Sequence, residues 1–121
     1  MAATVLVADD DADILRFIEI NLRLEGFEVV TARDGLDALS KVVTVWPDLV
    51  LLDVRMPSID GYTICARIRA DPNLAAIPVI MVTANYGSAE VEAARQAGAD
   101  DFLVKPFLPA TLLDMAKAVL R

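Results

Sequence analysis

The chain has 121 residues, 56% of them hydrophobic, which fits one globular domain with its own core over residues 1–121. It carries 18 acidic and 11 basic side chains, a net charge of −7, and this charge argues against direct binding to nucleic acid or to an anionic membrane. Histidine is absent, which excludes a histidine triad, a histidine-ligated metal and a phosphohistidine on this chain.

The first part of the chain alternates apolar strands with amphipathic helices. Residues 4–8 and 27–31 are apolar runs rich in β-branched residues, typical of buried strands. Helices are expected over residues 12–25, where Gly26 stops the pattern, and from Asp34 onward. Spacings of three and four predict the apolar faces of these helices: Ile14, Phe17, Ile18 and Leu22 in the first, and Leu36, Leu39, Val43 and Trp46 in the second.

The alternation continues around a central strand, residues 49–53. Its four leading residues are apolar without a break, as in a strand buried on both faces of a parallel sheet, and it ends in the carboxylate of Asp53. The later elements are expected at residues 61–70 (helix), 77–83 (strand), 88–97 (helix), 101–105 (strand) and 109–120 (helix). Short connections between alternating strands and helices predict a parallel sheet covered on both faces, and right-handed crossovers leave few strand orders, the flavodoxin-like order among them.

Polar side chains stand at the carboxyl ends of four of these strands. Asp9 and Asp10 follow the first, Asp53 ends the third, Thr83 the fourth and Lys105 the fifth. Each has a plain structural explanation, because acids cap helices, Asp favours turns, Thr suits strands and Lys suits a solvated surface. In a parallel sheet, however, all of these ends lie at one edge, so we expect the five side chains to share a site.

Three clustered carboxylates are costly without a cation. Two like charges about 4 Å apart repel by about 4 kcal/mol at an effective dielectric constant near ~20, a large share of a domain's stability. Carboxylate oxygens without nitrogen or sulfur ligands suit Mg²⁺ or Mn²⁺, and Mg²⁺ pairs readily with phosphate oxygens. Lys105 and Thr83 add a positive charge and a hydroxyl for other phosphate oxygens. We therefore predict that Asp53 accepts a phosphoryl group.

Four motifs resemble the receiver domain (CheY-like) of bacterial two-component response regulators over nearly the whole chain. They are Val7-Ala8-Asp9-Asp10, Leu52-Asp53-Val54-Arg55-Met56-Pro57 with Asp60-Gly61, Val82-Thr83-Ala84 and Lys105-Pro106-Phe107. The resemblance implies a flavodoxin-like (βα)5 three-layer α/β sandwich with a five-stranded parallel sheet in the order 2-1-3-4-5. It also implies a cis peptide bond between Lys105 and Pro106.

The resemblance assigns a role to each residue at this edge. Asp53 becomes the phosphoacceptor, and Mg²⁺ is held by Asp9, by Asp10 more directly, by Asp53 and by the backbone carbonyl of Arg55. The phosphoryl oxygens are contacted by Thr83 and Lys105 and by the amide of Ala84. Arg55 and Asn85, two residues beyond Asp53 and Thr83, are expected to tune the lifetime of the acyl phosphate.

The resemblance also implies a signalling role. The phosphoryl donor is a sensor histidine kinase or a phosphotransfer protein, and the target is a downstream protein or an output domain missing from the chain. Catalysis is limited to self-catalysed phosphoryl transfer and dephosphorylation, so the chain is no enzyme in the ordinary sense. The surface of the fourth helix, fifth strand and fifth helix is expected to report phosphorylation through Thr83 and Phe102. Phe102 stands where the family often has a switch tyrosine, so a coupling through a tyrosine hydroxyl is excluded.

Other functions fit the sequence less well. A haloacid-dehalogenase-type phosphatase needs a second Asp where Arg55 stands, a flavodoxin needs a hydroxyl-rich and glycine-rich loop after the first strand, and the Gly-Lys-Ser/Thr nucleotide loop is missing. An interaction module that keeps the fold without being phosphorylated stays open. The single Cys65, the lack of a long apolar run and the lack of a visible signal peptide lead us to expect a cytoplasmic protein. Homodimer formation on phosphorylation, and whether the chain is a stand-alone regulator or a fragment, stay open.

Overall fold

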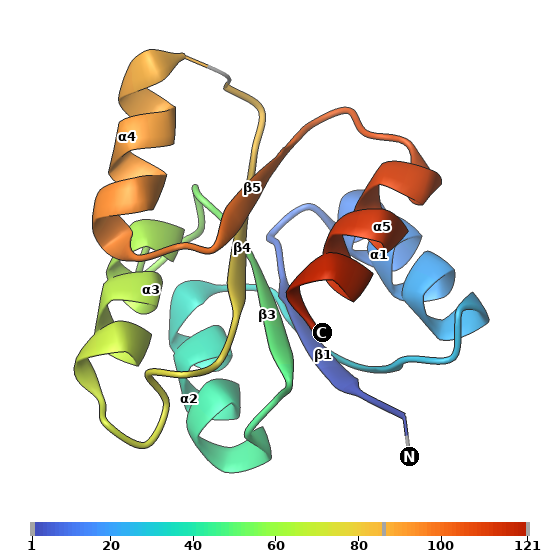
Figure 1. The fold of residues 1–121 in the computed structure, drawn as a ribbon, viewed down its shortest axis with the longest axis horizontal. Helices are drawn as coiled ribbons and strands as arrows, with labels where there is room; N and C mark the ends of the chain where they lie inside the picture. Colours follow the sequence, from blue (N-terminus) through green and yellow to red (C-terminus); the bar gives the residue numbers. More distant parts are fainter. Residues whose placement is uncertain (1, 86, 121) are drawn as a thin grey trace.

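The computed structural model describes residues 2–85 and 87–120 and alternates five strands with five helices (Figure 1). The strands are β1 (Thr4–Ala8), β2 (Glu28–Ala32), β3 (Leu49–Asp53), β4 (Val79–Thr83) and β5 (Asp101–Val104). The helices are α1 (Ala12–Leu24), α2 (Gly35–Val45), α3 (Gly61–Ala70), α4 (Ser88–Ala97) and α5 (Pro109–Val119). The strands form one parallel sheet in the order β2-β1-β3-β4-β5, which confirms the expected flavodoxin-like architecture.

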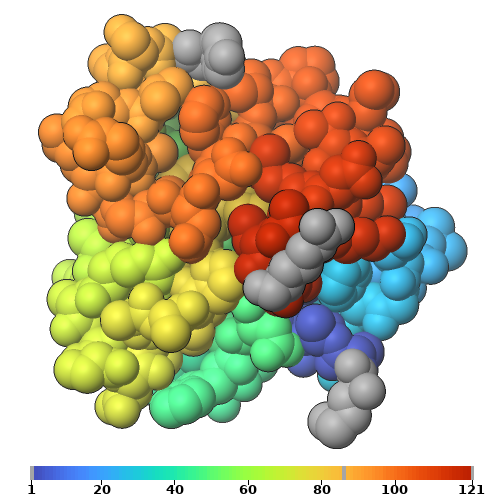
Figure 2. All heavy atoms as spheres, in the orientation of Figure 1, coloured from blue at the N-terminus to red at the C-terminus, as the bar shows by residue number. Residues whose placement is uncertain are grey.

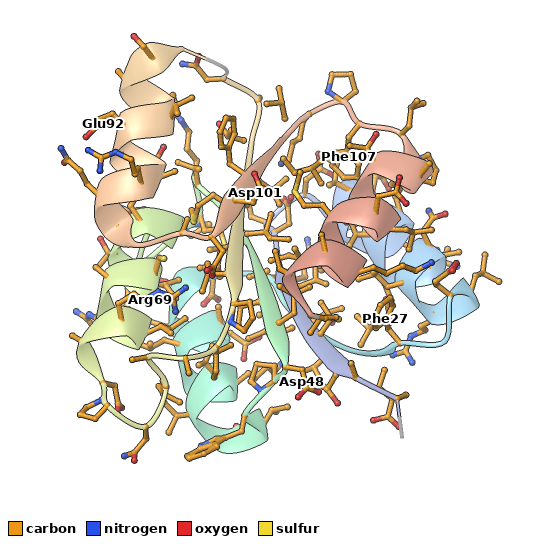
Figure 3. The ribbon with its side chains drawn as sticks, in the orientation of Figure 1. Phe27, Asp48, Arg69, Glu92, Asp101 and Phe107 are labelled. Atoms are coloured by element: carbon orange, nitrogen blue, oxygen red, sulfur yellow. The ribbon has the colours of Figure 1, made fainter. Side chains whose placement is uncertain are left out.

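The sheet is the middle layer of three. One hydrophobic cluster joins its first face to α1 and α5, and a second cluster joins its other face to α2, α3 and α4. The ribbon shows the same division, and side chains fill the space between sheet and helices (Figures 1 and 3). All residues of β3 and β4 are buried, which explains why these strands read as continuous apolar runs. In the space-filling view α4, β5 and α5 form a continuous orange-to-red surface (Figure 2).

Acidic N-caps start three of the helices. The side chains of Asp11, Asp34 and Asp60 accept hydrogen bonds from backbone N–H groups in the first turns of α1, α2 and α3. Gly98, at φ 91°, closes α4 in the left-handed conformation that glycine adopts without strain, and Pro109 starts α5. Each of these three acidic residues directly precedes the first residue of its helix, in the segment that connects the helix to the preceding strand.

Two predicted helix faces need correction. In α2, Leu36, Val43 and Trp46 are exposed by 60%, 53% and 58%, whereas Ala38 and Val42 are buried; of the predicted face, Leu39 packs against the core. The spacing identified a helix but misplaced its buried face, because apolar residues follow one another along this helix and several of its faces fit a helical repeat.

In α1 the side chain of Phe17 is 40% exposed, and Leu15, absent from the predicted face, is buried. Phe17 instead packs on Phe107 from the segment before α5, with ring centroids 6.0 Å apart. Several element ends also differ by one or two residues from expectation. None of the helices in the described parts of the chain is long and apolar enough to cross a membrane.

Candidate functional site

The carboxyl ends of the central strands open into one pocket of about 440 Å³. Parallel pairing in register brings β1, β3, β4 and β5 to the same edge, so residues far apart in sequence become neighbours. The pocket is lined by all the residues predicted for the site except Phe102, and by two others: Asp9, Asp10, Asp11, Asp53, Val54, Arg55, Thr83, Ala84, Asn85 and Lys105.

Three carboxylates meet in this pocket. Asp9, Asp10 and Asp53 each place one oxygen within 4.8 Å of the others. Asp9 and Asp53 are only 1% and 8% exposed, whereas Asp10 is open to solvent. Asp9 Oδ1 accepts a hydrogen bond from the backbone N–H of Asp11 at 2.9 Å, and its buried Oδ2 faces the ammonium of Lys105 and accepts from no other group among the described residues. A buried carboxylate oxygen with a free lone pair, beside two more carboxylates, fits a hard divalent cation.

Lys105 is the cation that the chain itself brings to the cluster. Its Nζ lies 2.9 Å from Asp9 Oδ2 and 3.3 Å from Asp53 Oδ1, and its side chain is 15% exposed. Burial and the neighbouring Asp9 charge raise the pKa of Asp53 to about 6, although Lys105 pulls it down. Burial lowers the pKa of Lys105, but the Asp9 and Asp53 carboxylates outweigh it and raise that pKa overall. One ammonium therefore leaves the three carboxylates undercompensated.

Gly61 supports the back of the site. Its N–H donates to the carbonyl oxygen of Val54 at 2.9 Å, and a Cβ at this position would lie 2.4 Å from the backbone oxygen of Asp53. Only glycine allows this close approach of α3 to the end of β3. Sequence reasoning named Gly61 as part of a motif but gave it no role, since the contact depends on how α3 returns to the strand.

Thr83 closes the other side of the pocket. Its Oγ1 accepts a hydrogen bond from the N–H of Asn85 at 3.0 Å and donates to the Asn85 carbonyl oxygen at 3.3 Å. The hydroxyl is therefore engaged by the β4–α4 loop. Ala84 and Asn85 are exposed at the rim, as is Arg55 across the pocket. Phe102 lies outside the pocket, half-buried against the core beneath α3 and α4.

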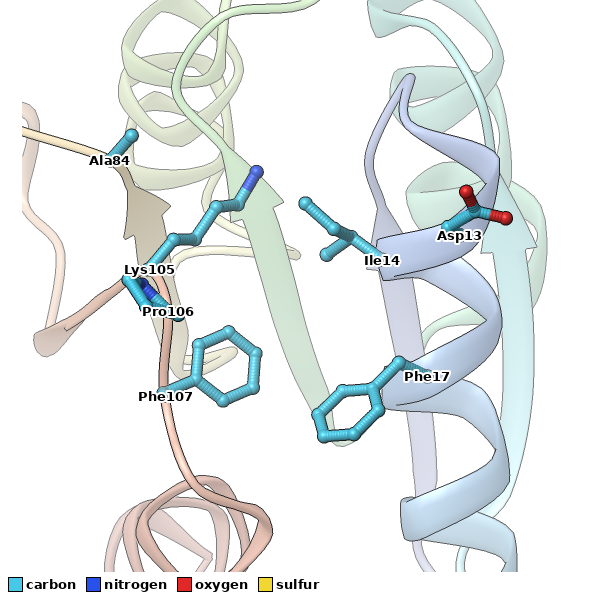
Figure 4. A pocket seen from close by; sticks show the side chains of 7 residues that line it. All are labelled: Asp13, Ile14, Phe17, Ala84, Lys105, Pro106 and Phe107. Carbon is cyan, nitrogen blue, oxygen red and sulfur yellow. The ribbon is translucent and has the colours of Figure 1, made fainter.

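A second, apolar hollow of about 560 Å³ adjoins the pocket, with Ala84 and Lys105 in both linings. Figure 4 shows Ile14 and Phe17 of α1 facing Pro106 and Phe107 across it. The peptide bond between Lys105 and Pro106 is cis, as the resemblance implied. Sequence reasoning missed this hollow because it assigned Phe17 to the core.

Comparison with known proteins identifies the family of this chain. A model of the response regulator receiver domain matches residues 5–117. The chain belongs to this family. Transcriptional regulatory protein PrrA of Mycobacterium tuberculosis is 45% identical over 117 residues, covering 97% of this chain and 49% of that protein. DNA-binding response regulator MtrA of Mycobacterium leprae is 40% identical over 121 residues, covering 100% of this chain and 52% of that protein.

This receiver-family chain thus spans about half the length of the curated relatives that it matches. Its fold also matches a solved structure over nearly the whole length of both chains. The chemotaxis response regulator CheY4 of Vibrio cholerae superposes with a TM-score of 0.93 at 33% identity, covering 98% of this chain and 99% of that one. The chain is therefore a response regulator receiver domain by sequence and by fold.

Proposed function

We propose that residues 1–121 form one receiver domain that accepts a phosphoryl group on Asp53 in a Mg²⁺-dependent or Mn²⁺-dependent reaction. The observation that carries this proposal is the pocket itself, in which three carboxylates meet one lysine and the buried Asp9 Oδ2 faces only that lysine among the described residues. Catalysis is confined to the chain's own phosphorylation and dephosphorylation. The domain acts as a two-component signalling phosphoprotein.

The donor set fits the cation. Asp9, Asp10 and Asp53 would hold Mg²⁺ through one oxygen each, with the backbone carbonyl of Arg55 as a further ligand. When bound, the metal neutralises charge on the carboxylates and on the incoming phosphoryl oxygens. Asp9, hydrogen-bonded to the Asp11 amide, keeps its second oxygen pointed into the pocket.

The chain's own groups position the reaction. A carboxylate oxygen of Asp53 attacks the phosphorus atom of a phosphohistidine, an O–P bond forms as the N–P bond breaks, and the imidazole leaves with the electron pair. Lys105, already 3.3 Å from Asp53, moves its charge to a phosphoryl oxygen. The Thr83 hydroxyl and the Ala84 amide donate to the other oxygens, and Arg55 and Asn85 at the rim govern the approach of water.

The phosphoryl donor that we propose is a histidine kinase or a phosphotransfer protein, and its phosphohistidine must belong to another protein, because this chain has no histidine. A donor histidine that reaches Asp53 must cover the rim of the pocket, where the adjoining apolar hollow between α1 and the β5–α5 segment supplies contact area. Phe17 and Phe107 are the aromatic side chains of that surface. We therefore propose that the hollow is part of the surface that binds the phosphoryl-donor protein.

The readout is the surface of α4, β5 and α5. Phosphorylation draws Thr83 away from Asn85, and the vacated space admits the ring of Phe102, which shifts an existing equilibrium. The target is a downstream protein or an output domain joined to this one. The relatives PrrA and MtrA are described as a transcriptional regulator and a DNA-binding regulator, and their other halves lie outside the match.

The test is a mass measurement after incubation with a small acyl-phosphate donor. We expect a mass gain of one phosphoryl group that requires Mg²⁺ and is lost in Asp53→Asn. A wild-type chain that stays unmodified with Mg²⁺ present would favour the interaction module that keeps the fold without phosphorylation.

A further inference from the structure

The two ends of α4 are held in very different ways. At its C-terminal end, Arg69 of α3 donates from Nε to the carbonyl oxygen of Gly98 at 2.8 Å. The same guanidinium donates to the carbonyl oxygens of Ala75 and Ile77 and to Asp100 Oδ2, the last at 2.7 Å. Asp100 in turn accepts the N–H of Val79 at the start of β4. The partly buried guanidinium of Arg69, with its several N–H donors, thus fixes this end of α4 to α3 and to the sheet.

The N-terminal end of α4 has far less support. Its N-cap is Gly87, which offers no side-chain hydrogen bond, and Ala94, further along, is the one fully buried residue of the helix. Across to α3, the hydroxyl of Tyr62 donates to the Glu90 carboxylate. The other side-chain hydrogen bond at this end lies within the β4–α4 loop, where the N–H of Gly87 donates to Asn85 Oδ1 at 3.0 Å, so among the described residues Tyr62 is the side chain of another helix or strand that hydrogen-bonds to the first turn of α4. Burial and the Glu90 carboxylate raise the pKa of Tyr62 to about 12, which keeps the phenol a donor.

We propose that α4 pivots about its Arg69-bound C-terminal end and that the Tyr62–Glu90 hydrogen bond is the latch that opposes this movement. The proposal rests on the phosphoryl-acceptor role assigned to Asp53. It goes beyond that role because neither residue lines the pocket. Figure 1 shows the arrangement, with the C-terminal end of α4 beside α3 and β5 and its other end leading back to β4.

The latch lies close to the site in the chain and in space. Tyr62 directly follows Gly61, the residue packed on the Asp53 backbone. On the other side, Thr83 holds the β4–α4 loop through its two hydrogen bonds with Asn85. When Thr83 turns to a phosphoryl oxygen, these two bonds are lost, and the latch remains as the side-chain hydrogen bond that ties the first turn of α4 to α3. Its strength then sets how far phosphorylation shifts the equilibrium.

Hydrogen exchange on the unphosphorylated protein tests the latch without any phosphoryl chemistry. The amides of Glu90 and Val91 donate to the Gly87 carbonyl oxygen at the free end, and those of Gly98 and Ala99 report on the fixed end. In Tyr62→Phe we expect exchange at the free end to rise on the order of tenfold, the worth of a hydrogen bond to a charged group, with the fixed end unchanged. An equal rise in exchange at both ends of α4, or no rise at the free end, would overturn the proposal.

Binding of beryllofluoride with Mg²⁺, a phosphoryl mimic, gives the second readout. If the latch opposes the phosphorylated state, Tyr62→Phe and Glu90→Ala each tighten binding on the order of tenfold, and the double variant tightens it no further. Glu92→Ala is the matched control, since Glu92 bonds Arg95 and Gln96 within α4 and lies on its outer side (Figure 3). Unchanged or weaker binding in Tyr62→Phe would refute the latch. Absence of Mg²⁺-dependent binding to the wild type would instead refute the role of Asp53, and hydrogen exchange would still decide on the latch.

Discussion

Replacing Asp53 by Asn should stabilise the metal-free protein at neutral pH. The carboxylate of Asp53 is nearly buried beside that of Asp9, and its pKa is raised from 3.8 to about 6. Each pKa unit corresponds to about 1.4 kcal/mol, so a shift of about two units sets an upper bound near 3 kcal/mol on the destabilisation. Solvent at the open side of the pocket screens part of this, and we expect Asp53→Asn to gain about 1–3 kcal/mol.

The sign of the pH dependence follows from the direction of the shift. Because the folded pKa of Asp53 lies above the unfolded value, the folded state binds more protons between these two values, about pH 4 to 6. The penalty is therefore full above about pH 6 and disappears as the pH falls toward 4. Asp53→Asn should lack this part of the pH dependence, so its advantage over the wild type shrinks on acidification.

Urea unfolding in EDTA at pH 7 and near pH 4 measures both effects. Asp114→Asn, at an exposed position on α5, is the matched control and should change little. With Mg²⁺ in excess the order should reverse, because the wild type gains binding energy that the variant has partly lost. If Asp53→Asn were no more stable than the wild type in EDTA at pH 7, the electrostatic reasoning about the cluster would be refuted.

Three further variants probe the surroundings of Asp53. Gly61→Ala would place a methyl group 2.4 Å from the Asp53 carbonyl oxygen, so we expect the free energy of unfolding in urea to fall by about 1–3 kcal/mol and phosphorylation to slow. Wild-type stability and wild-type phosphorylation rate in this variant would contradict the close packing. Phe17→Ala should slow phosphoryl transfer from the kinase several-fold but leave transfer from small acyl-phosphate donors unaffected. Equal slowing of both reactions would show that the hollow is not the surface that binds the kinase. Phe102→Ala should leave phosphorylation intact but uncouple it from partner binding, and affinities that still change on phosphorylation would argue against a role in switching.

Much of the fold follows from local patterns. The short continuous apolar run of β3, bounded by Pro47 and Pro57, favours a strand buried on both faces, and it also places Asp53 at the strand's end. Because parallel strands end at one edge, the convergence of the site residues could be expected without coordinates. The choice of helix face in α2 could not, since Leu36 and Ala38 both fit a helical repeat, and only the three-dimensional packing shows that Ala38 is buried and Leu36 exposed.

The sequence also could not rank the acids of the pocket. Asp9 and Asp10 are adjacent and identical in type, yet the end of β1 turns Asp9 inward to Lys105 and leaves Asp10 in solvent. The roles of Gly61 and of Arg69 could not be predicted from the sequence for a related reason. Each depends on a contact between segments that no periodicity or spacing records, such as the guanidinium of Arg69 reaching the last turn of α4.

The most direct test of the central claim is to locate the phosphoryl group. After incubation with an acyl-phosphate donor and Mg²⁺, reduction with borohydride converts an aspartyl phosphate to homoserine, and peptide sequencing by mass spectrometry then identifies the position. The account predicts homoserine at residue 53 and at no other Asp. Modification at Asp9 or Asp10 in place of Asp53, or at surface acids without preference, would contradict it.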